Sequence, residues 1–183
     1  MTPDTPRYDQ YEASLQTDLQ LLCRQRGWLP ARFIHTDDLE EKWKELAPEY
    51  LQDAVAQFNA YPVATLAWAA YIGIAEAAFW DTDWEANKMR GYISIAGEGG
   101  FDTLDENVVR NILNLPPDAP EATHIDDQLA CLAGSADDRL RHEGAEPGSP
   151  DAFYLFTRTL RVLYRMGVAL ELHRRGYRWE EVR

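Results

Sequence analysis

Residues 62–80 constrain the fold more than any other part of the chain, because Thr65 and Glu76 are almost the only polar side chains in this stretch. As a helix it would be about 28 Å long, close to the thickness of the hydrocarbon core of a bilayer. However, the stretch is rich in alanine rather than leucine, and acidic residues follow it over 81–85 instead of a basic anchor. We therefore predict a central helix of a soluble protein, buried on most sides, and not a membrane span.

The predicted helix over 62–80 carries two further patterns. Small residues recur at every fourth position, at Ala69, Gly73 and Ala77. Residues four apart lie on one helix face, so we expect a neighbouring helix to approach closely there. Thr65, Glu76 and Asp83 point in one direction around the helix axis if the helix continues to residue 83. This polar stripe is either the solvent-facing seam of the helix or one wall of a pocket.

Helix signals are frequent along the rest of the chain, and strand patterns are scarce. Apolar spacing and turn residues predict helices over about residues 6–26, 37–59, 62–80, 103–114, 120–142 and 150–175. Asp37 is expected to cap the second helix, and Pro48 is expected to end or kink it, because proline has no N–H for a helix interior. Residues 84–95 are ambiguous, since they fit either a short strand or the end of a helix.

The last predicted helix has the clearest ends. Ser149 is expected to cap its first turn, and Pro150 is expected to occupy its first helical position. At the other end, Gly176 is placed where a left-handed residue often stops a helix. Tyr177 is expected to pack on Leu172, as in a Schellman motif.

These features predict an all-α fold: a single multihelical domain over residues 1–183, with about six or seven helices in a bundle-like or orthogonal arrangement. The Ala-rich helix over 62–80 is expected at its centre. A chain of 183 residues is long enough to bury a substantial core without a disulfide or a metal ion.

The charge of the chain restricts its partners. It has 31 acidic and 18 basic residues, a net charge of −13, and such a surface repels the phosphates of nucleic acids and anionic lipids. We expect no nucleic-acid or membrane partner; a protein partner or a homo-oligomer remains open. Cys23 and Cys131 lack the spacing of a metal or disulfide motif, and residues 1–6 lack the features of a secretory signal, so we expect a cytoplasmic protein.

Several segments together resemble a known family. They are residues 61–68, 79–84, 101–106, 141–147, 164–167 and 171–177. Over about residues 60–180 the chain resembles an uncharacterised, all-helical bacterial family, seen mostly in Bacteroidetes, that is known only as a domain of unknown function. The resemblance implies an all-helical domain, and it carries over no activity and no catalytic residue.

The acidic residues after the apolar stretch raise the question of a metal site. Asp81, Asp83 and Glu85 lie within five residues and offer the oxygen ligands that Mg²⁺ and Ca²⁺ prefer. An EF-hand loop that began at Asp81 would need Gly and Glu where this chain has Ala86 and Tyr92. An EF-hand is therefore excluded, and an acidic helix junction is the simpler interpretation.

A second metal-like pattern is Glu121-x-x-His124, which places two ligands on one helix face, as in di-iron carboxylate bundles. Those sites need two such motifs and this chain has one, so the ordinary acidic start of a helix explains it as well. If folding brought Glu76, Asp81, Asp83 and His124 together, they would form a site for a divalent metal. Glu76, Asp81 and His124 would then be the catalytic candidates of a metal-assisted hydrolase.

Arg158, Arg161 and Arg165 share the face of the last helix opposite to its apolar face, and we call this the Arg face. Apolar residues interleave with the arginines, so we expect this face to be covered. The cover is either an acidic helix of the same chain or a partner, and the functional alternative is an anion pocket for a phosphate or carboxylate ligand. The expected partners within the chain are Asp126, Asp127, Asp137 and Asp138. Glu171 projects toward the apolar face and is expected to have an arginine or hydroxyl partner.

The chain contains no complete catalytic motif. Its glycines at 97–100 are not followed by the Lys-Ser or Lys-Thr of a P-loop, and it has no Gly-x-Ser-x-Gly. The sequence therefore favours an interaction or ligand-binding protein, with the metal-assisted hydrolase as the alternative. It does not decide whether the chain is an enzyme, nor which cofactor it would use.

Overall fold

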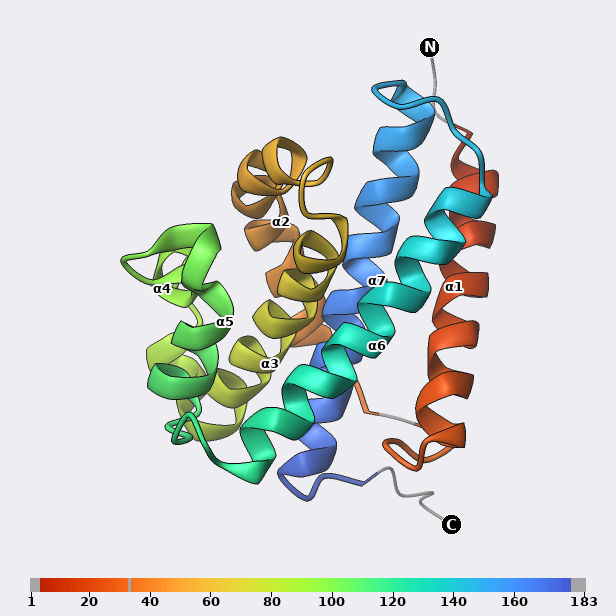
Figure 1. Cartoon of the computed structure of the whole chain (residues 1–183). Coiled ribbons are helices and arrows are strands. Elements are labelled where there is room, and N and C mark those ends of the chain that lie inside the picture. The colour runs from red at the N-terminus through yellow and green to blue at the C-terminus, as the bar shows by residue number, and fades with distance from the viewer. Residues whose placement is uncertain (1–3, 33, 179–183) are drawn as a thin grey trace.

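In the computed structural model, which describes residues 4–32 and 34–178, all regular structure is helical (Figure 1). The longer helices are α1 (Thr5–Gln25), α2 (Asp37–Gln57), α3 (Pro62–Asn87), α6 (Pro120–His142) and α7 (Pro150–Arg174). The shorter ones are α4 (Tyr92–Ala96), a 3₁₀-helix (Gly100–Thr103), α5 (Leu104–Glu106) and a π-helical turn (Asn107–Ile112). No strand occurs in the described residues, so the all-α prediction is confirmed and residues 92–96 are a helix.

The ends of α7 are as expected. The Ser149 hydroxyl oxygen accepts a hydrogen bond of 3.1 Å from the Ala152 N–H, and Pro150 is the first helical residue. Gly176 has a φ of 98°, and the Tyr177 N–H donates to the Leu172 carbonyl at 3.0 Å. This is the Schellman pattern, so local sequence signals were sufficient to predict both boundaries.

The predicted cap of α2 is wrong, and Pro48 does not end this helix. The capping side chain is Thr36, which accepts from the Leu39 N–H at 3.2 Å, and Asp37 is already inside the helix. In addition, α2 continues through Pro48 to Gln57. A single proline removes one hydrogen bond, and the packing of α2 on the rest of the fold compensates for that loss.

Helix α3 extends beyond residue 80 and changes direction at Asp83, whose φ of −165° and ψ of 91° are not helical. The Asp83 side chain accepts a hydrogen bond of 3.1 Å from the Ala86 N–H, so it caps the last turn. The kink breaks the angular alignment of Asp83 with Thr65 and Glu76 that a straight helix would give. Thr65 and Glu76 are fully buried, so they do not form a solvent-facing seam.

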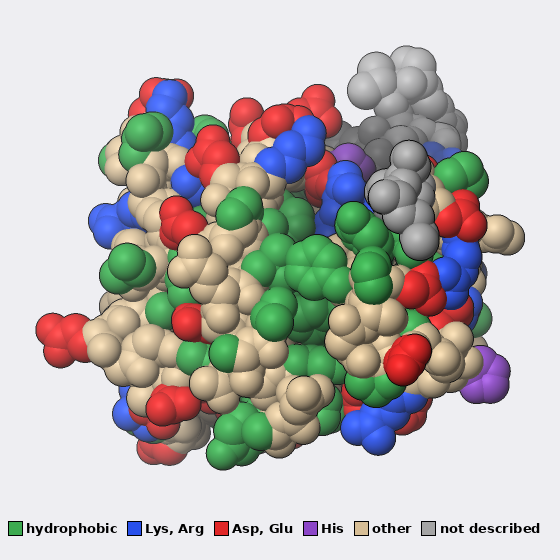
Figure 2. Space-filling model, turned by 90° about the horizontal axis from the view of Figure 1, so that it is seen from above, with side chains coloured by type: hydrophobic (Ala, Val, Ile, Leu, Met, Phe, Trp, Pro, Cys, Tyr) green, Lys and Arg blue, Asp and Glu red, His purple; other side chains and the backbone are tan. Residues whose placement is uncertain are grey.

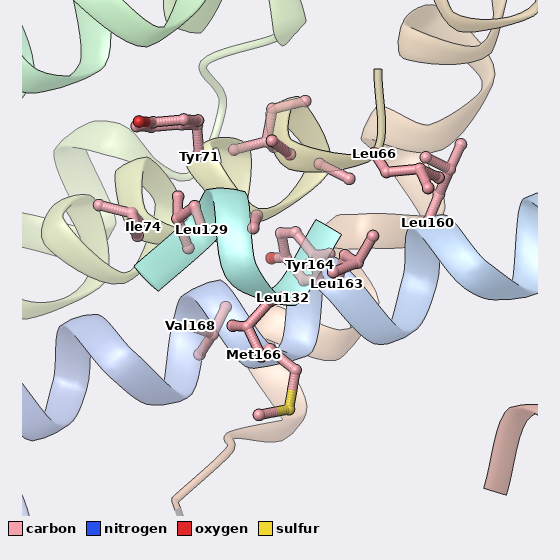
Figure 3. Packing of buried hydrophobic residues seen from close by; sticks show 14 of the residues in the cluster. Leu66, Tyr71, Ile74, Leu129, Leu132, Leu160, Leu163, Tyr164, Met166 and Val168 are labelled. Atoms are coloured by element: carbon pink, nitrogen blue, oxygen red, sulfur yellow. The ribbon is translucent and has the colours of Figure 1, made fainter. Parts of the chain in front are cut away.

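The core lies where α3 packs between α6 and α7. Figure 3 shows side chains of all three helices meeting there, among them Ile74, Leu132 and Leu163. The predicted close approach to α3 is confirmed at Gly73, where a Cβ atom would lie 2.9 Å from the backbone nitrogen of Val168. The small residue on α7 is Gly167, and the backbones of the two helices are almost in contact.

Helix α3 is the one helix in the described part of the chain that is long and apolar enough to cross a membrane. Its most apolar window has a mean hydropathy of 1.4, and 72% of that window is buried inside the fold. This burial is typical of the core helix of a soluble protein, as the sequence predicts.

A candidate ligand-binding groove

An apolar groove lies at one end of the molecule, where the turn between α2 and α3 meets the turn between α6 and α7. Figure 2 looks onto this end and shows apolar side chains gathered in a central hollow. The groove has a volume of about 600 Å³. Its apolar walls come from Val55, Phe58, Pro62, Leu140, Ala145, Pro147, Ala152, Phe153 and Phe156. We call it the end groove.

The end groove forms because two chain reversals place aromatic residues side by side. Gly144 and Gly148 have φ values of 69° and 80°, which allow the chain to turn back from α6 into α7. The first turns of α7 then bring Phe156 against Phe58 of α2, with ring centroids 4.6 Å apart. Phe153 is 43% exposed, so an aromatic surface stays open to solvent in the groove.

Asp137 supplies the buried polar group of the end groove. Only 5% of the residue is exposed. One carboxylate oxygen, Oδ2, pairs with the Arg141 guanidinium at 3.0 Å. The other, Oδ1, is buried and has no hydrogen-bond partner among the described residues. A buried acceptor without a partner is costly. Asp137 lines the groove, and a small turn of its carboxylate would bring Oδ1 within reach of a bound molecule.

The other polar groups around the end groove are less available for chemistry. Ser149 is the one hydroxyl-bearing residue among its described lining residues, and its oxygen is engaged as the cap of α7. Asn59 is exposed at the rim, and the Arg141 side chain is 68% exposed. The end groove thus combines apolar walls with one buried acceptor and one cation at the edge, features that small-molecule sites share.

Glu76, the first candidate metal ligand, lies in the protein interior. It is fully buried, and neither of its carboxyl oxygens has a partner among the described residues. Burial raises the pKa of Glu76 to about 8, although the Lys42 ammonium acts in the opposite direction. At neutral pH the group is therefore mostly protonated and poorly suited to bind a cation.

The two aspartates after the apolar stretch have structural partners. Asp81 accepts hydrogen bonds from the Tyr177 hydroxyl at 2.6 Å and the Arg175 guanidinium at 2.9 Å, and these bonds lower the pKa of its carboxyl. Asp83 caps the last turn of α3. The Tyr177 ring also lies edge-on to Trp80, with ring centroids 5.6 Å apart.

His124 lines a different cavity, beside Trp28, and none of the three candidate carboxylates lines that cavity. Within residues 4–32 and 34–178, no group of three or more His, Cys, Asp or Glu side chains is placed to hold a metal ion. The structure therefore gives Glu76, Asp81, Asp83 and His124 separate surroundings. The metal-assisted hydrolase stays a prediction without a geometric basis in these residues.

The Arg face is covered by the chain itself, but not by the residues expected. Arg158 pairs with Glu12 at 3.0 Å, Arg161 with Glu40 at 3.0 Å, and Arg165 with Glu40 at 2.5 Å. The cover comes from α1 and α2. The prediction that the acidic residues of 120–142 would supply it is wrong: the Asp126 carboxylate accepts from the Tyr71 hydroxyl, and Asp137 pairs with Arg141.

Glu171 has the arginine partner that the sequence predicts. Only 2% of Glu171 is exposed. Its carboxylate accepts two hydrogen bonds from Arg174, at 2.5 and 2.7 Å, and one from Arg175 at 3.3 Å. The end groove itself was not predicted. Its only signal in the sequence is that Phe153 and Phe156 start the apolar face of the last helix, directly after a Gly- and Pro-rich turn.

Comparison with protein-family models, with curated proteins and with solved structures finds no match to this chain. The resemblance to a bacterial family of unknown function therefore stays a prediction.

Proposed function

We propose that this protein binds a small amphiphilic molecule in the end groove. The apolar part of the ligand lies against Phe58, Phe153 and Phe156, and a hydroxyl group of the ligand donates to Oδ1 of Asp137. The volume of about 600 Å³ is in the range of small-molecule sites. The observation that carries the proposal is a buried, unpartnered carboxylate oxygen on a residue that lines a mainly apolar groove.

The charges around Asp137 favour a neutral donor in the ligand. Arg141 already offsets the carboxylate through Oδ2, so an ammonium group would add an unbalanced cation next to the guanidinium. A carboxylate head group has no hydrogen to donate to the Asp137 oxygen, and the two negative charges would repel each other. A hydroxyl satisfies Oδ1 and adds no charge.

The proposal is for a soluble, cytoplasmic binding protein. Cys23 and Cys131 are free thiols in the structure, which fits a reducing compartment. The net charge of −13 argues against nucleic acids and anionic membranes as partners.

The proposal is tested with 1-octanol, octanoate and octylamine, which share one alkyl chain and differ in the head group. Calorimetric titration of the full chain is expected to give the tightest binding for octanol, with octanoate at least tenfold weaker. The thermal midpoint should rise with octanol, because a ligand that binds only the folded state stabilises it. Binding that does not depend on the head group would contradict the role of Asp137.

Asp137→Leu is the decisive variant. It removes the acceptor while keeping a side chain of similar size, so the preference for octanol over octanoate should disappear. Asp138→Leu changes the neighbouring, exposed aspartate and should keep the preference, which makes it the matched control. If Asp137→Leu discriminates between head groups as well as the unchanged protein, the proposed hydrogen bond does not exist.

A further inference from the structure

A second cavity, of about 250 Å³, lies at the other end of the molecule, where α1 ends, α6 begins and α7 ends (Figure 1). We call it the Trp28 cavity. The half-buried Trp28 forms one side of it, and Ile74, Ile125 and Leu170 give it apolar walls. The His124 ring stands edge-on to the Trp28 indole, with ring centroids 6.4 Å apart. The space is therefore flat-walled and partly aromatic.

Gln128 lines the Trp28 cavity with a side-chain amide that has no hydrogen-bond partner within the described part of the chain. Only 8% of Gln128 is exposed. Each side-chain amide offers two N–H donors and one carbonyl acceptor. The amide atoms of Gln128 are not among the fully buried unpartnered atoms of the described residues, so the amide opens into the cavity and is available to a molecule bound there.

Arg174 supplies a fixed cation at the same cavity. Glu171, which is almost fully buried, accepts two hydrogen bonds from Arg174 at 2.5 and 2.7 Å, and these hold the guanidinium in place. A guanidinium has five N–H donors, so donors remain after these two bonds. The Arg174 side chain is 35% exposed, which leaves the remaining donors open to a ligand.

A further cation lies beside the Trp28 cavity, although the chain as a whole carries a net charge of −13. The Arg26 guanidinium lies over the Trp28 ring, 5.9 Å from its centroid. Burial and the nearby Arg178 lower the pKa of His173, so its imidazole is neutral at pH 7 and can both donate and accept a hydrogen bond. The acidic groups acting here are Glu171, which is already paired, and Glu121, which acts on Arg174 from α6.

We propose that the Trp28 cavity is a second ligand site, for a small aromatic carboxylate. The ring lies against Trp28 and the apolar walls, and the carboxylate accepts hydrogen bonds from the Gln128 amide and the Arg174 guanidinium. The volume of about 250 Å³ suits a single ring with its carboxylate. This site is separate from the end groove. Its ligand carries a negative charge, whereas the ligand proposed for the end groove has a neutral head group.

The test uses benzoate as the probe, with benzamide as its neutral analogue and inorganic phosphate as an anion without a ring. Calorimetric titration of the full chain is expected to show benzoate binding at least tenfold tighter than benzamide or phosphate. The indole N–H signal of Trp28 in a nitrogen-15 NMR spectrum should shift on titration, which locates the site. The absence of benzoate binding, or equal binding of phosphate, would overturn the proposal.

Gln128→Leu removes the unpartnered amide and keeps the size of the side chain. Benzoate affinity is expected to fall at least tenfold, while the ligand-free variant should melt at the same temperature or higher. Gln52→Leu changes an exposed glutamine of α2 and should leave the affinity unchanged. Unchanged benzoate affinity in Gln128→Leu would overturn the site, and so would a lower melting temperature, because that would show an internal partner for the amide.

Discussion

At the scale of single residues, Glu76 is the group whose state depends most on its surroundings. It lies in the middle of α3, fully buried, with no hydrogen-bond partner among the described residues. Lys42 and Glu45 of α2 act on its charge, and its charge acts in turn on the buried Tyr164 of α7. The sequence shows a carboxyl in an apolar stretch, but only the fold shows that no side chain of the described residues donates a hydrogen bond to it.

The first prediction is a pH dependence of stability caused by Glu76. Its pKa is about 8 in the folded state and ordinarily 4.5, so between these values the folded chain holds a proton that the unfolded chain has released. The free energy of unfolding should therefore fall as pH rises from 4.5 to 8, by roughly 1.4 kcal/mol per pH unit. Urea denaturation at pH 5, 6, 7 and 8 measures this slope.

The matching variant is Glu76→Gln, which keeps the shape and removes the titration. Its stability advantage over the unchanged protein should be near zero at pH 5 and grow steadily toward pH 8. Glu45→Gln alters a nearby carboxylate of α2 whose side chain is 70% exposed, and it should leave most of the slope in place. Parallel stability curves for Glu76→Gln and the unchanged chain would show that Glu76 is not protonated in the fold.

At the scale of elements, α3 and α7 come closest where backbone meets backbone, at Gly73 and Gly167. A Cβ atom at Gly167 would lie 2.8 Å from the carbonyl carbon of Ala70, and one at Gly73 would meet the backbone of Tyr164. Backbone atoms inside two long helices cannot move aside as the tip of a side chain can.

We therefore expect Gly73→Ala and Gly167→Ala each to destabilise the fold by about 3 kcal/mol or more, at the upper end of the usual cost of overpacking. Gly134→Ala is the control, because Gly134 lies inside α6 and a Cβ there meets nothing within 4 Å. That change should stabilise the protein by roughly 0.5–1 kcal/mol through helix propensity. Chemical denaturation compares the three, and similar effects at all three positions would contradict the close crossing.

The Arg face gives the second prediction at this scale. Burial alone would raise the pKa of Glu40, but hydrogen bonds from Arg165 and Arg161 outweigh it and lower the pKa. We expect the Arg161→Ala, Arg165→Ala double variant to lose roughly 2 kcal/mol or more of stability in ligand-free protein, since it leaves Glu40 half-buried without a cation.

The network also has a pH signature. Because the pKa of Glu40 is lowered in the fold, its contribution is present above its ordinary pKa and is lost as the pH falls through the folded value. The difference in free energy of unfolding between the unchanged chain and the double variant should therefore become smaller as the pH is lowered. An unchanged melting temperature for the double variant at pH 7 would mean that the arginines do not hold α7 to α1 and α2.

The scale of elements is also where sequence-based prediction works and where it fails. Caps, prolines and stop glycines act within a few residues, so the ends of α7 are readable from Ser149, Pro150 and Gly176. The ion-pair partner of an arginine is not predictable in this way, because it depends on which helix packs against the arginine. Acidic residues are plentiful throughout this chain, and their number does not indicate that Glu12 and Glu40 are the ones that face α7.

At the scale of the whole molecule, both proposed sites lie between elements that are far apart in the sequence. The end groove needs Phe58 from α2 and Phe153 from α7, and the Trp28 cavity needs Trp28, Gln128 and Arg174 from three segments. No periodicity or motif links such residues before the chain is folded. The all-α fold and its buried central helix were therefore predictable, whereas the places where a ligand would fit were not.

The glycine contact between α3 and α7 has a consequence for these two sites. Two straight helices that cross at an angle are closest at the crossing and separate on either side of it. The end groove lies on one side, lined by Pro62 and Phe156, and the Trp28 cavity lies on the other, lined by Ile74 and Arg174. The glycines at this crossing therefore set the separation of α3 and α7. A bulkier residue at Gly73 or Gly167 would change the width of the end groove and of the Trp28 cavity, although it lies far from either ligand.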